Sequence, residues 1–364
     1  MIACIKKSRS QAYLRTISAV SVNYLERVAD PASAFHADYL DYKSGRIARD
    51  DLIARLPHIA MIGDSLSKDV YISSPLSTFW RARMRRRNNW FLDTGPSSAS
   101  VYSVFERLDR FTPLVAMEYA GLGALVDSGQ DRQWLSRKIL RTRNFSGQVS
   151  QLLSHKRFPN LILIWIGHNN VDWAWRSPPA ELKQPEKRLQ RLSDHFRENY
   201  TCQTRRLVAR GQTESHRVAI VVFGLADFGS FFKARRVAEM LRKKNAKLYP
   251  YLGSDFKYFI SMRPAYRSDL LRLVRMVNEG LSAMVEQLNR EYELRYSLNV
   301  QLRYCDALAR VDLSSVEVIH AVDGWHPSVQ GHNAFAEAAF RELGPSLEFV
   351  GIAGGRAKVD PRSQ

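Results

Sequence analysis

Five short runs of apolar residues constrain the fold of this chain more than any other feature of its sequence. Each run is continuous rather than alternating and ends in Gly, Asn or Asp: they are HIAMIGDS, PLVAMEYAG, NLILIWIGHNN, RVAIVVFGLADF and NVQLRYCDA. Such runs are typical of strands buried on both faces, as in a parallel sheet. Longer stretches with helical patterning separate them, which predicts a doubly wound α/β fold with five strands and helices on both faces. Ligands of such folds bind at the carboxyl ends of the strands.

The same patterning divides the chain into segments. Residues 1–54 are predicted to form a helical N-terminal extension, and residues 55–345 the α/β domain. The long segment between the fourth and fifth strands, residues 228–265, permits a lid over the site. Residues 346–364 are expected to form a mobile tail, because Gly, Pro and charged residues dominate its end.

The first apolar run ends in Gly63-Asp64-Ser65-Leu66. A serine on the turn after a strand has its hydroxyl at the ligand-binding edge of the sheet, where a nucleophile belongs. The alternative is that Ser65 caps the next helix by accepting a backbone N–H. The tetrapeptide alone favours neither reading.

A nucleophilic serine needs a base, and the base needs an orienting carboxylate. Among nine histidines, His326 stands apart because Asp323 precedes it by three residues, and Pro327 suits the start of a helix. His332 lies within that helix and is expected to be structural, and His320 is the weaker competitor. The alternative is that Asp323 only caps the helix and His326 is exposed.

Acyl transfer also needs hydrogen-bond donors for the developing oxyanion. The third run ends in GHNN, where the carboxamide of Asn169 can donate, and the second ends in EYAGLGA, whose glycines offer backbone N–H groups. The alternative is that these glycines only permit tight turns. The order of the blocks along the chain is more informative than any one of them.

The blocks are GDSLS at 63–67, EYAGLGA at 118–124, GHNN at 167–170 and DGWHP at 323–327. This ordered set, within residues 58–343, resembles the SGNH superfamily of GDSL-type serine esterases and lipases. The resemblance implies a flavodoxin-like three-layer sandwich around a mainly parallel five-stranded sheet. It also implies that no metal or organic cofactor is needed.

The resemblance assigns roles to individual residues. It makes Ser65 the nucleophile, His326 the general base and Asp323 its orienting partner. Gly123 and Asn169 become oxyanion donors beside the backbone N–H of Ser65, with Gly121 as an alternative to Gly123. Two positions depart from the family pattern: the family commonly has Asn in place of Glu118, and Asp in place of Asn170.

The charge of the chain bears on its partners rather than on its fold. The formal net charge is +18, with basic clusters at residues 81–87 and 233–257, the second interleaved with aromatic residues. These clusters are either ordinary solvated faces or a surface for phosphate groups, and an anionic membrane is favoured over nucleic acid.

Targeting signals are weak in this sequence. There is no run of eighteen apolar residues, and the segment after Lys6, Lys7 and Arg9 is too short and polar for a convincing signal peptide. Three scattered cysteines exclude a disulfide scaffold and a cysteine-based zinc site, and mildly favour a reducing compartment. We therefore expect a location in the cytoplasm or at the periphery of a membrane.

These observations together predict a serine hydrolase of carboxylic esters that works through an acyl-enzyme, with a lipid or other acyl ester as substrate. An acyltransferase would differ from this hydrolase only in that an alcohol, rather than water, attacks the acyl-enzyme. The sequence therefore leaves acyl transfer as an alternative. The competing class is a basic binding module in which the triad is idle. That reading leaves Ser65, Asp323 and His326 unexplained, whereas the hydrolase reading leaves the charge unexplained.

Overall fold

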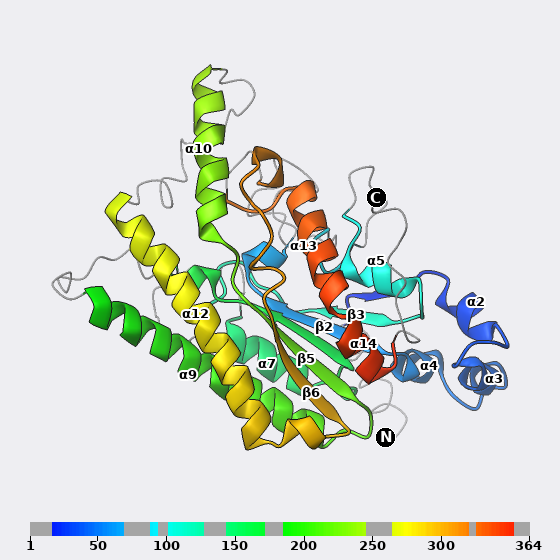
Figure 1. Ribbon diagram of the computed structural model, residues 1–364. Helices are drawn as coiled ribbons and strands as arrows, with labels where there is room; N and C mark the ends of the chain where they lie inside the picture. The colour runs from blue at the N-terminus through cyan, green and yellow to red at the C-terminus, as the bar shows by residue number, and fades with distance from the viewer. Residues whose placement is uncertain are drawn as a thin grey trace.

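The computed structural model describes residues 17–68, 88–93, 101–126, 143–171, 185–244, 264–319 and 325–352. Helices pack on both sides of a central sheet (Figure 1). The predicted three-layer α/β sandwich is therefore confirmed. The basic cluster at residues 81–87 lies outside the described residues.

The central sheet is built from the five predicted strands and one more. Its strands are β1 (Ala19–Val20), β2 (His58–Gly63), β3 (Val115–Glu118), β4 (Leu161–Trp165), β5 (Val218–Phe223) and β6 (Val300–Cys305), in the order β1-β3-β2-β4-β5-β6. β2 to β6 are parallel, and β1 pairs with β3 in the antiparallel direction. The expected count of five was wrong by one, because a two-residue strand leaves no apolar run for a sequence pattern to detect.

Burial explains why four of the five runs are continuous. Every residue of β2, β3, β4 and β5 is buried, so neither face of these strands meets water. β6 lies at the end of the sheet, and Gln301, Arg303 and Tyr304 are only half-buried there. A continuous apolar run in the sequence thus indicates a strand that is covered by helices on both faces of the sheet.

Two groups of helices make the outer layers. One consists of α7 (Phe145–Leu153), α9 (Pro185–Gln212) and α12 (Pro264–Glu291), with α9 and α12 packed along each other. The other consists of α5 (Val104–Asp109), α13 (Val329–Glu342) and α14 (Gly344–Val350). α14 overlaps the segment from residue 346 that was expected to be a mobile tail. Leu347 and Ile352 are buried, so the start of that segment is held by apolar packing.

The N-terminal segment forms a small core of its own. It contains α2 (Tyr24–Ala29), α3 (His36–Lys43) and α4 (Arg49–Arg55). Apolar side chains of α2 and α4 pack with Leu56 and with Val115 of β3. This segment therefore rests on the sheet through one strand.

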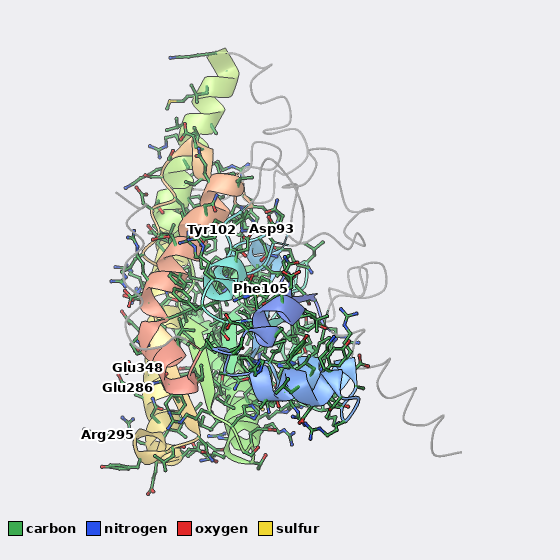
Figure 2. The ribbon with its side chains drawn as sticks, turned by 90° about the vertical axis from the view of Figure 1, so that its right-hand side faces the viewer. Asp93, Tyr102, Phe105, Glu286, Arg295 and Glu348 are labelled. Carbon is green, nitrogen blue, oxygen red and sulfur yellow. The ribbon has the colours of Figure 1, made fainter. Side chains whose placement is uncertain are left out.

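Helix α10 (Phe228–Lys244) follows β5 and extends beyond the rest of the described chain in both views (Figures 1 and 2). It occupies the first part of the 228–265 segment, and residues 245–263 lie outside the described residues. Within the described ranges, no helix has a stretch long and apolar enough to cross a bilayer.

Candidate active site

The strand order places two of the candidate residues, Ser65 and Asn169, at the same edge of the sheet. β2 lies between β3 and β4, so the chain leaves β2 for one side of the sheet and later returns on the other. Such a switch point leaves a crevice at the carboxyl ends of the strands, where doubly wound folds bind ligands. Ser65 follows β2 and Asn169 follows β4, so both lie at this switch point.

The turn that carries Ser65 is a short 3-10 helix, η1 (Ser65–Ser67). The carboxylate of Asp64 caps it by accepting the backbone N–H of Leu66 at 3.1 Å. The capping residue is therefore Asp64, and the alternative that Ser65 serves as the cap is wrong. A side chain at Gly63 would overlap Ser67, at 2.8 Å from its Cβ, which explains why glycine precedes this turn.

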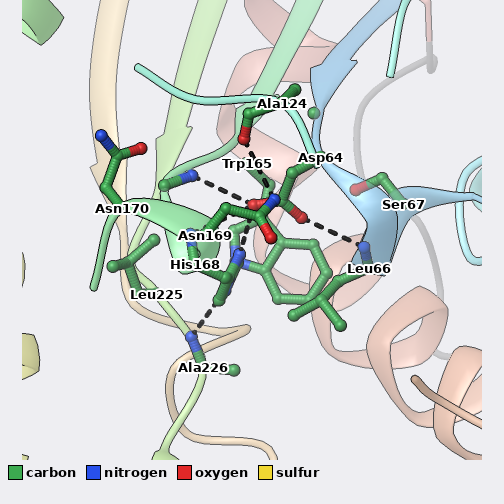
Figure 3. A network of polar contacts seen from close by, with 12 residues as sticks. Asp64, Leu66, Ser67, Ala124, Trp165, His168, Asn169, Asn170, Leu225 and Ala226 are labelled. Atoms are coloured by element: carbon green, nitrogen blue, oxygen red, sulfur yellow. Dashed lines mark hydrogen bonds and ion pairs between the residues drawn. The ribbon is translucent and has the colours of Figure 1, made fainter. Parts of the chain in front are cut away.

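The carboxylate of Asp64 also binds the turn that follows β4 (Figure 3). Its Oδ2 accepts the backbone N–H groups of Gly167 and His168, each at 3.1 Å, and lies 2.8 Å from Nδ1 of His168. Asp64 is fully buried, and burial of a carboxylate is tolerated when several N–H donors satisfy it. One side chain thus joins the Ser65 turn to the Asn169 turn.

His168 extends this connection to a third strand. The backbone N–H of Ala226, just after β5, donates to Nε2 of His168 at 3.2 Å. Since Nε2 accepts, the proton of the neutral ring lies on Nδ1 and is donated to Asp64. The imidazole is buried against the indole of Trp165, with ring centroids 4.8 Å apart. Sequence reasoning missed this residue; its position directly after Gly167 at a strand end was the available signal.

Both asparagines of the β4 turn bind the loop after β3. The Asn169 Nδ2 donates to the carbonyl of Ala124 at 3.0 Å, and the Asn170 Oδ1 accepts the N–H of Val126 at 2.9 Å. Gly123 has φ of 66°, a left-handed conformation that glycine adopts without strain. The N–H of Gly121 donates to the carbonyl of Gly63 at 3.1 Å, so it is engaged within the backbone.

The segment with the candidate base returns to the same edge. Ile319 and Pro327 form an isolated antiparallel bridge, and His326 beside it is half-buried. Asp323 and His320 lie outside the described residues, so the geometry of the Asp323–His326 pair is not described. Trp325 and Leu66 line one pocket, so the neighbours of His326 and of Ser65 face the same cavity.

His332 has a structural contact, as its place in the helix predicts. Its Nδ1 accepts the backbone N–H of Trp90 at 3.2 Å, and its ring is fully buried. The indole N–H of Trp90 in turn donates to Oγ of Ser67 at 3.0 Å. α13 is therefore tied to the turn that carries Ser65, and the hydroxyl of Ser67 is engaged and buried.

A comparison with protein families finds a match over most of the chain. The family model described as "GDSL-like Lipase/Acylhydrolase" matches residues 59–339, more than half of the chain. The chain belongs to this family. The match begins in β2 and ends in α13, so it includes all four sequence blocks.

Solved structures and curated proteins add little to the GDSL family assignment. The crystal structure of the lipase Lip_vut3 from a goat rumen metagenome covers 78% of this chain and 95% of its own, at 14% identity and a TM-score of 0.37. A second structure covers 80% and 97% at 13% identity and a TM-score of 0.35. Likeness this distant supports no argument about the chain. A comparison with curated proteins found no significant match.

The two departures from the GDSL family pattern have contacts of their own. Glu118 forms an ion pair with Lys68 at 2.8 Å, and its carboxylate is fully buried. This pair joins the end of β3 to the residue after η1. At position 170, the Oδ1 of Asn accepts the backbone N–H of Val126. A carboxylate oxygen of Asp, the common residue in the family, would accept it equally well. Neither departure removes a connection between the loops of the site.

An apolar pocket lies beside the Ser65 turn, the candidate nucleophile turn of this GDSL family member. Aromatic and aliphatic side chains dominate its lining, and they come from η1, the start of α10, α13 and the segment around His326. Phe228 and Phe231 of α10 pack on Trp325, with ring centroids 5.2 and 4.7 Å apart. The pocket suits an apolar group rather than a charged one.

Proposed function

We propose that this protein is a serine hydrolase of carboxylic esters and that Ser65 is its nucleophile. The observation that carries the proposal is the buried Asp64 carboxylate, which fixes the Ser65 turn and the Asn169 turn to each other. A nucleophile and an oxyanion donor must be held in a fixed relation for acyl transfer. Membership of the GDSL family of lipases and acylhydrolases supports the same chemistry.

The reaction follows from the roles assigned to each group. Ser65 attacks the ester carbonyl while His326, oriented by Asp323, takes the hydroxyl proton. The N–H groups of Ser65 and Gly123 and the carboxamide of Asn169 stabilise the tetrahedral oxyanion. The Nδ2 of Asn169 carries two N–H groups, and the bond to Ala124 uses one of them.

Collapse of the tetrahedral species then divides the reaction into two halves. The alcohol leaves with the proton from His326, and the acyl group stays on Ser65. Water activated by His326 releases the acid and restores the enzyme. The apolar pocket beside Leu66 has a volume of about 20 Å³, so it has room for only the first atoms of an acyl group, and its lining favours esters of an apolar acid.

Labelling with a fluorophosphonate probe tests the nucleophile. Only a serine activated by a base reacts quickly with such a probe, so folded protein should form one adduct, at Ser65, and Ser65→Ala should form none. Ser65→Ala should also lose ester hydrolysis without losing its fold. Heat-unfolded protein is the control for nonspecific labelling. An adduct at Ser67, or none on folded protein, would refute the assignment.

A further inference from the structure

The outward side of α10 combines positive charge with exposed apolar side chains. The exposed residues here, called the outer face of α10, are Lys233, Arg236, Val237, Met240, Lys243 and Lys244. Val237 is 38% and Met240 50% exposed, although both are apolar. Four cations and two apolar residues therefore share one surface.

The spacing of these residues makes the surface continuous. Lys233, Val237, Met240 and Lys244 recur at intervals of four, three and four, which places them in one line along a helix. Arg236 and Lys243 lie to one side of that line. Long lysine and arginine side chains can keep their charge in the headgroup region while their stems lie along apolar surface.

The base of α10 belongs to the pocket beside the nucleophile turn. Phe228 and Phe231, in its first turn, are buried and line that pocket. The helix then extends away from the sheet for about 25 Å, given its 17 residues. Figures 1 and 2 show its far end beyond the rest of the described chain. The outer face is thus displayed on the same side of the molecule as the candidate active site.

We propose that the outer face of α10 docks on an anionic lipid surface. Its four cations meet lipid phosphates, while Val237 and Met240 enter the boundary between headgroups and acyl chains. α10 contains six basic residues and one acidic residue, and the whole chain carries +18, so the approach to a negative surface is favoured.

Other occupants fit this face less well. Nucleic acid would use the cations but gain nothing from Val237 and Met240, and the six described residues of the outer face include no aromatic side chain on which a base could stack. A second copy of the chain would bring like charges together. An anionic membrane is complementary to both properties of the surface.

Docking on a membrane also indicates where the substrate comes from. This part of the inference rests on the proposed function. A helix whose outer face lies on the membrane and whose base lines the pocket brings that pocket close to the lipid surface, because Lys233 of the outer face is only two residues from Phe231 in the pocket lining. An ester drawn from that surface reaches Ser65 without crossing bulk water. The substrate class is therefore a membrane-resident acyl ester.

Vesicle binding, measured by flotation, tests the docking surface. The Ser65→Ala protein is used so that no lipid is hydrolysed, with vesicles of phosphatidylcholine alone and of phosphatidylcholine with phosphatidylglycerol. Lys233→Gln with Lys244→Gln should weaken binding to the anionic vesicles by about fivefold per charge at low salt, and less at high salt. Met240→Ser should weaken binding severalfold at both salt concentrations.

Matched controls come from the opposite end of the molecule, where Arg295 is seen in Figure 2. Arg290→Gln with Arg295→Gln removes two exposed charges, and Leu298→Ser removes an apolar side chain that is 77% exposed. These controls should bind vesicles like the parent. Equal losses in the control and α10 variants, or no preference for anionic vesicles, would overturn the proposal. Tighter binding of duplex DNA than of vesicles, in the same assay, would replace the lipid by nucleic acid.

A soluble short-chain ester separates this inference from the proposed function. With Ser65 present, the α10 variants should hydrolyse that ester at the parent rate, because they leave the pocket and the reacting groups in place. Hydrolysis of the soluble ester without vesicle binding would refute docking and retain the hydrolase. Vesicle binding without any ester hydrolysis would support docking and refute the proposed function.

Discussion

Asn169 and Asn170 are adjacent residues that bind the same loop through different groups. Asn169 donates to a carbonyl, whereas Asn170 accepts from the N–H of Val126. If Asn169 holds the oxyanion, Asn169→Ala should lower kcat by roughly 10² to 10³ with little change in KM, because the contact strengthens only in the transition state. Steady-state kinetics on a soluble ester measure the effect.

Asn170 provides the matched comparison for that experiment. Asn170→Asp keeps an acceptor for Val126 and should retain most of the activity, whereas Asn170→Ala loses it and should loosen the loop. Small and equal effects of alanine at both positions would mean that the oxyanion is held elsewhere.

His168 is predicted to position the site without touching substrate. His168→Ala leaves the buried N–H of Ala226 without its acceptor and removes one of the donors to Asp64, so we expect a loss of about 2–4 kcal/mol of stability. The rate of fluorophosphonate labelling at Ser65 should also fall, because the turn loses part of its support. Thermal unfolding and labelling kinetics measure the two effects.

His58 is the control, since it is also fully buried but lies at the start of β2, far along the strand from Ser65. His58→Ala should lower stability and leave the labelling rate of the folded protein unchanged. A His168→Ala protein that labels at the parent rate would show that the network is structural only.

At the scale of elements, the start of α13 fixes the loop that carries His326. The backbone N–H of Ser328 donates to the carbonyl of Val318 at 3.0 Å, and Ser328 caps α13 through Gly331 at 3.2 Å. A methyl group at Gly331 would overlap the carbonyl oxygen of Val318, which is backbone and cannot rotate away.

Gly331→Ala should therefore push α13 from the segment at 316–318 and lower stability by about 1–3 kcal/mol. Activity on a soluble ester should fall as well, since this contact closes the loop that contains His326. Gly344→Ala, at the start of α14, is the control, because nothing lies within 4 Å of the added methyl group. Urea unfolding of the two variants compares them directly.

The elements also show what a sequence can and cannot predict. Four strands, β2 to β5, were predictable because each is buried on both faces and so reads as an unbroken apolar run. The run of β6, at the end of the sheet, is interrupted by the half-buried Gln301 and Arg303. β1 was not predictable, since a strand of two residues has no hydrophobic periodicity. The contact between Asp64 and His168 was not predictable either. These residues are 104 positions apart in the sequence and meet only because β2 and β4 are neighbours in the sheet. The positions of Ser65, Gly123 and Asn169 after their strands could be predicted without knowing which strands are neighbours.

For the whole molecule, buried histidines predict how stability depends on pH. Burial lowers the pKa of His58 to about 3, and burial also lowers the pKa values of His155 and His216. The unfolded chain binds protons at these histidines near the ordinary histidine pKa, whereas the folded chain binds them only at lower pH. Stability is therefore full above about pH 6.5 and declines as the pH falls toward 3, by up to ~1.4 kcal/mol per pH unit for His58.

Urea unfolding between neutral pH and mild acid measures this slope. His58→Asn keeps an N–H that can reach the carbonyl of Leu56, which Nδ1 now contacts at 2.7 Å, but it does not titrate. The variant should lose stability less steeply than the parent as the pH falls. Parallel curves would mean that His58 makes no contribution to acid sensitivity.

The short strand β1 has a consequence for how this domain can be isolated. The family match starts at residue 59, which suggests a natural place to cut. Yet Ser18 hydrogen-bonds to the backbone of β3, Ser21 bonds to Leu114 just before it, and Val115 packs into the N-terminal core. Without residues 17–56, β3 would become an open edge strand with unpaired N–H and C=O groups, which promotes association between copies. The N-terminal segment should therefore prevent copies of the protein from associating through this edge of the sheet.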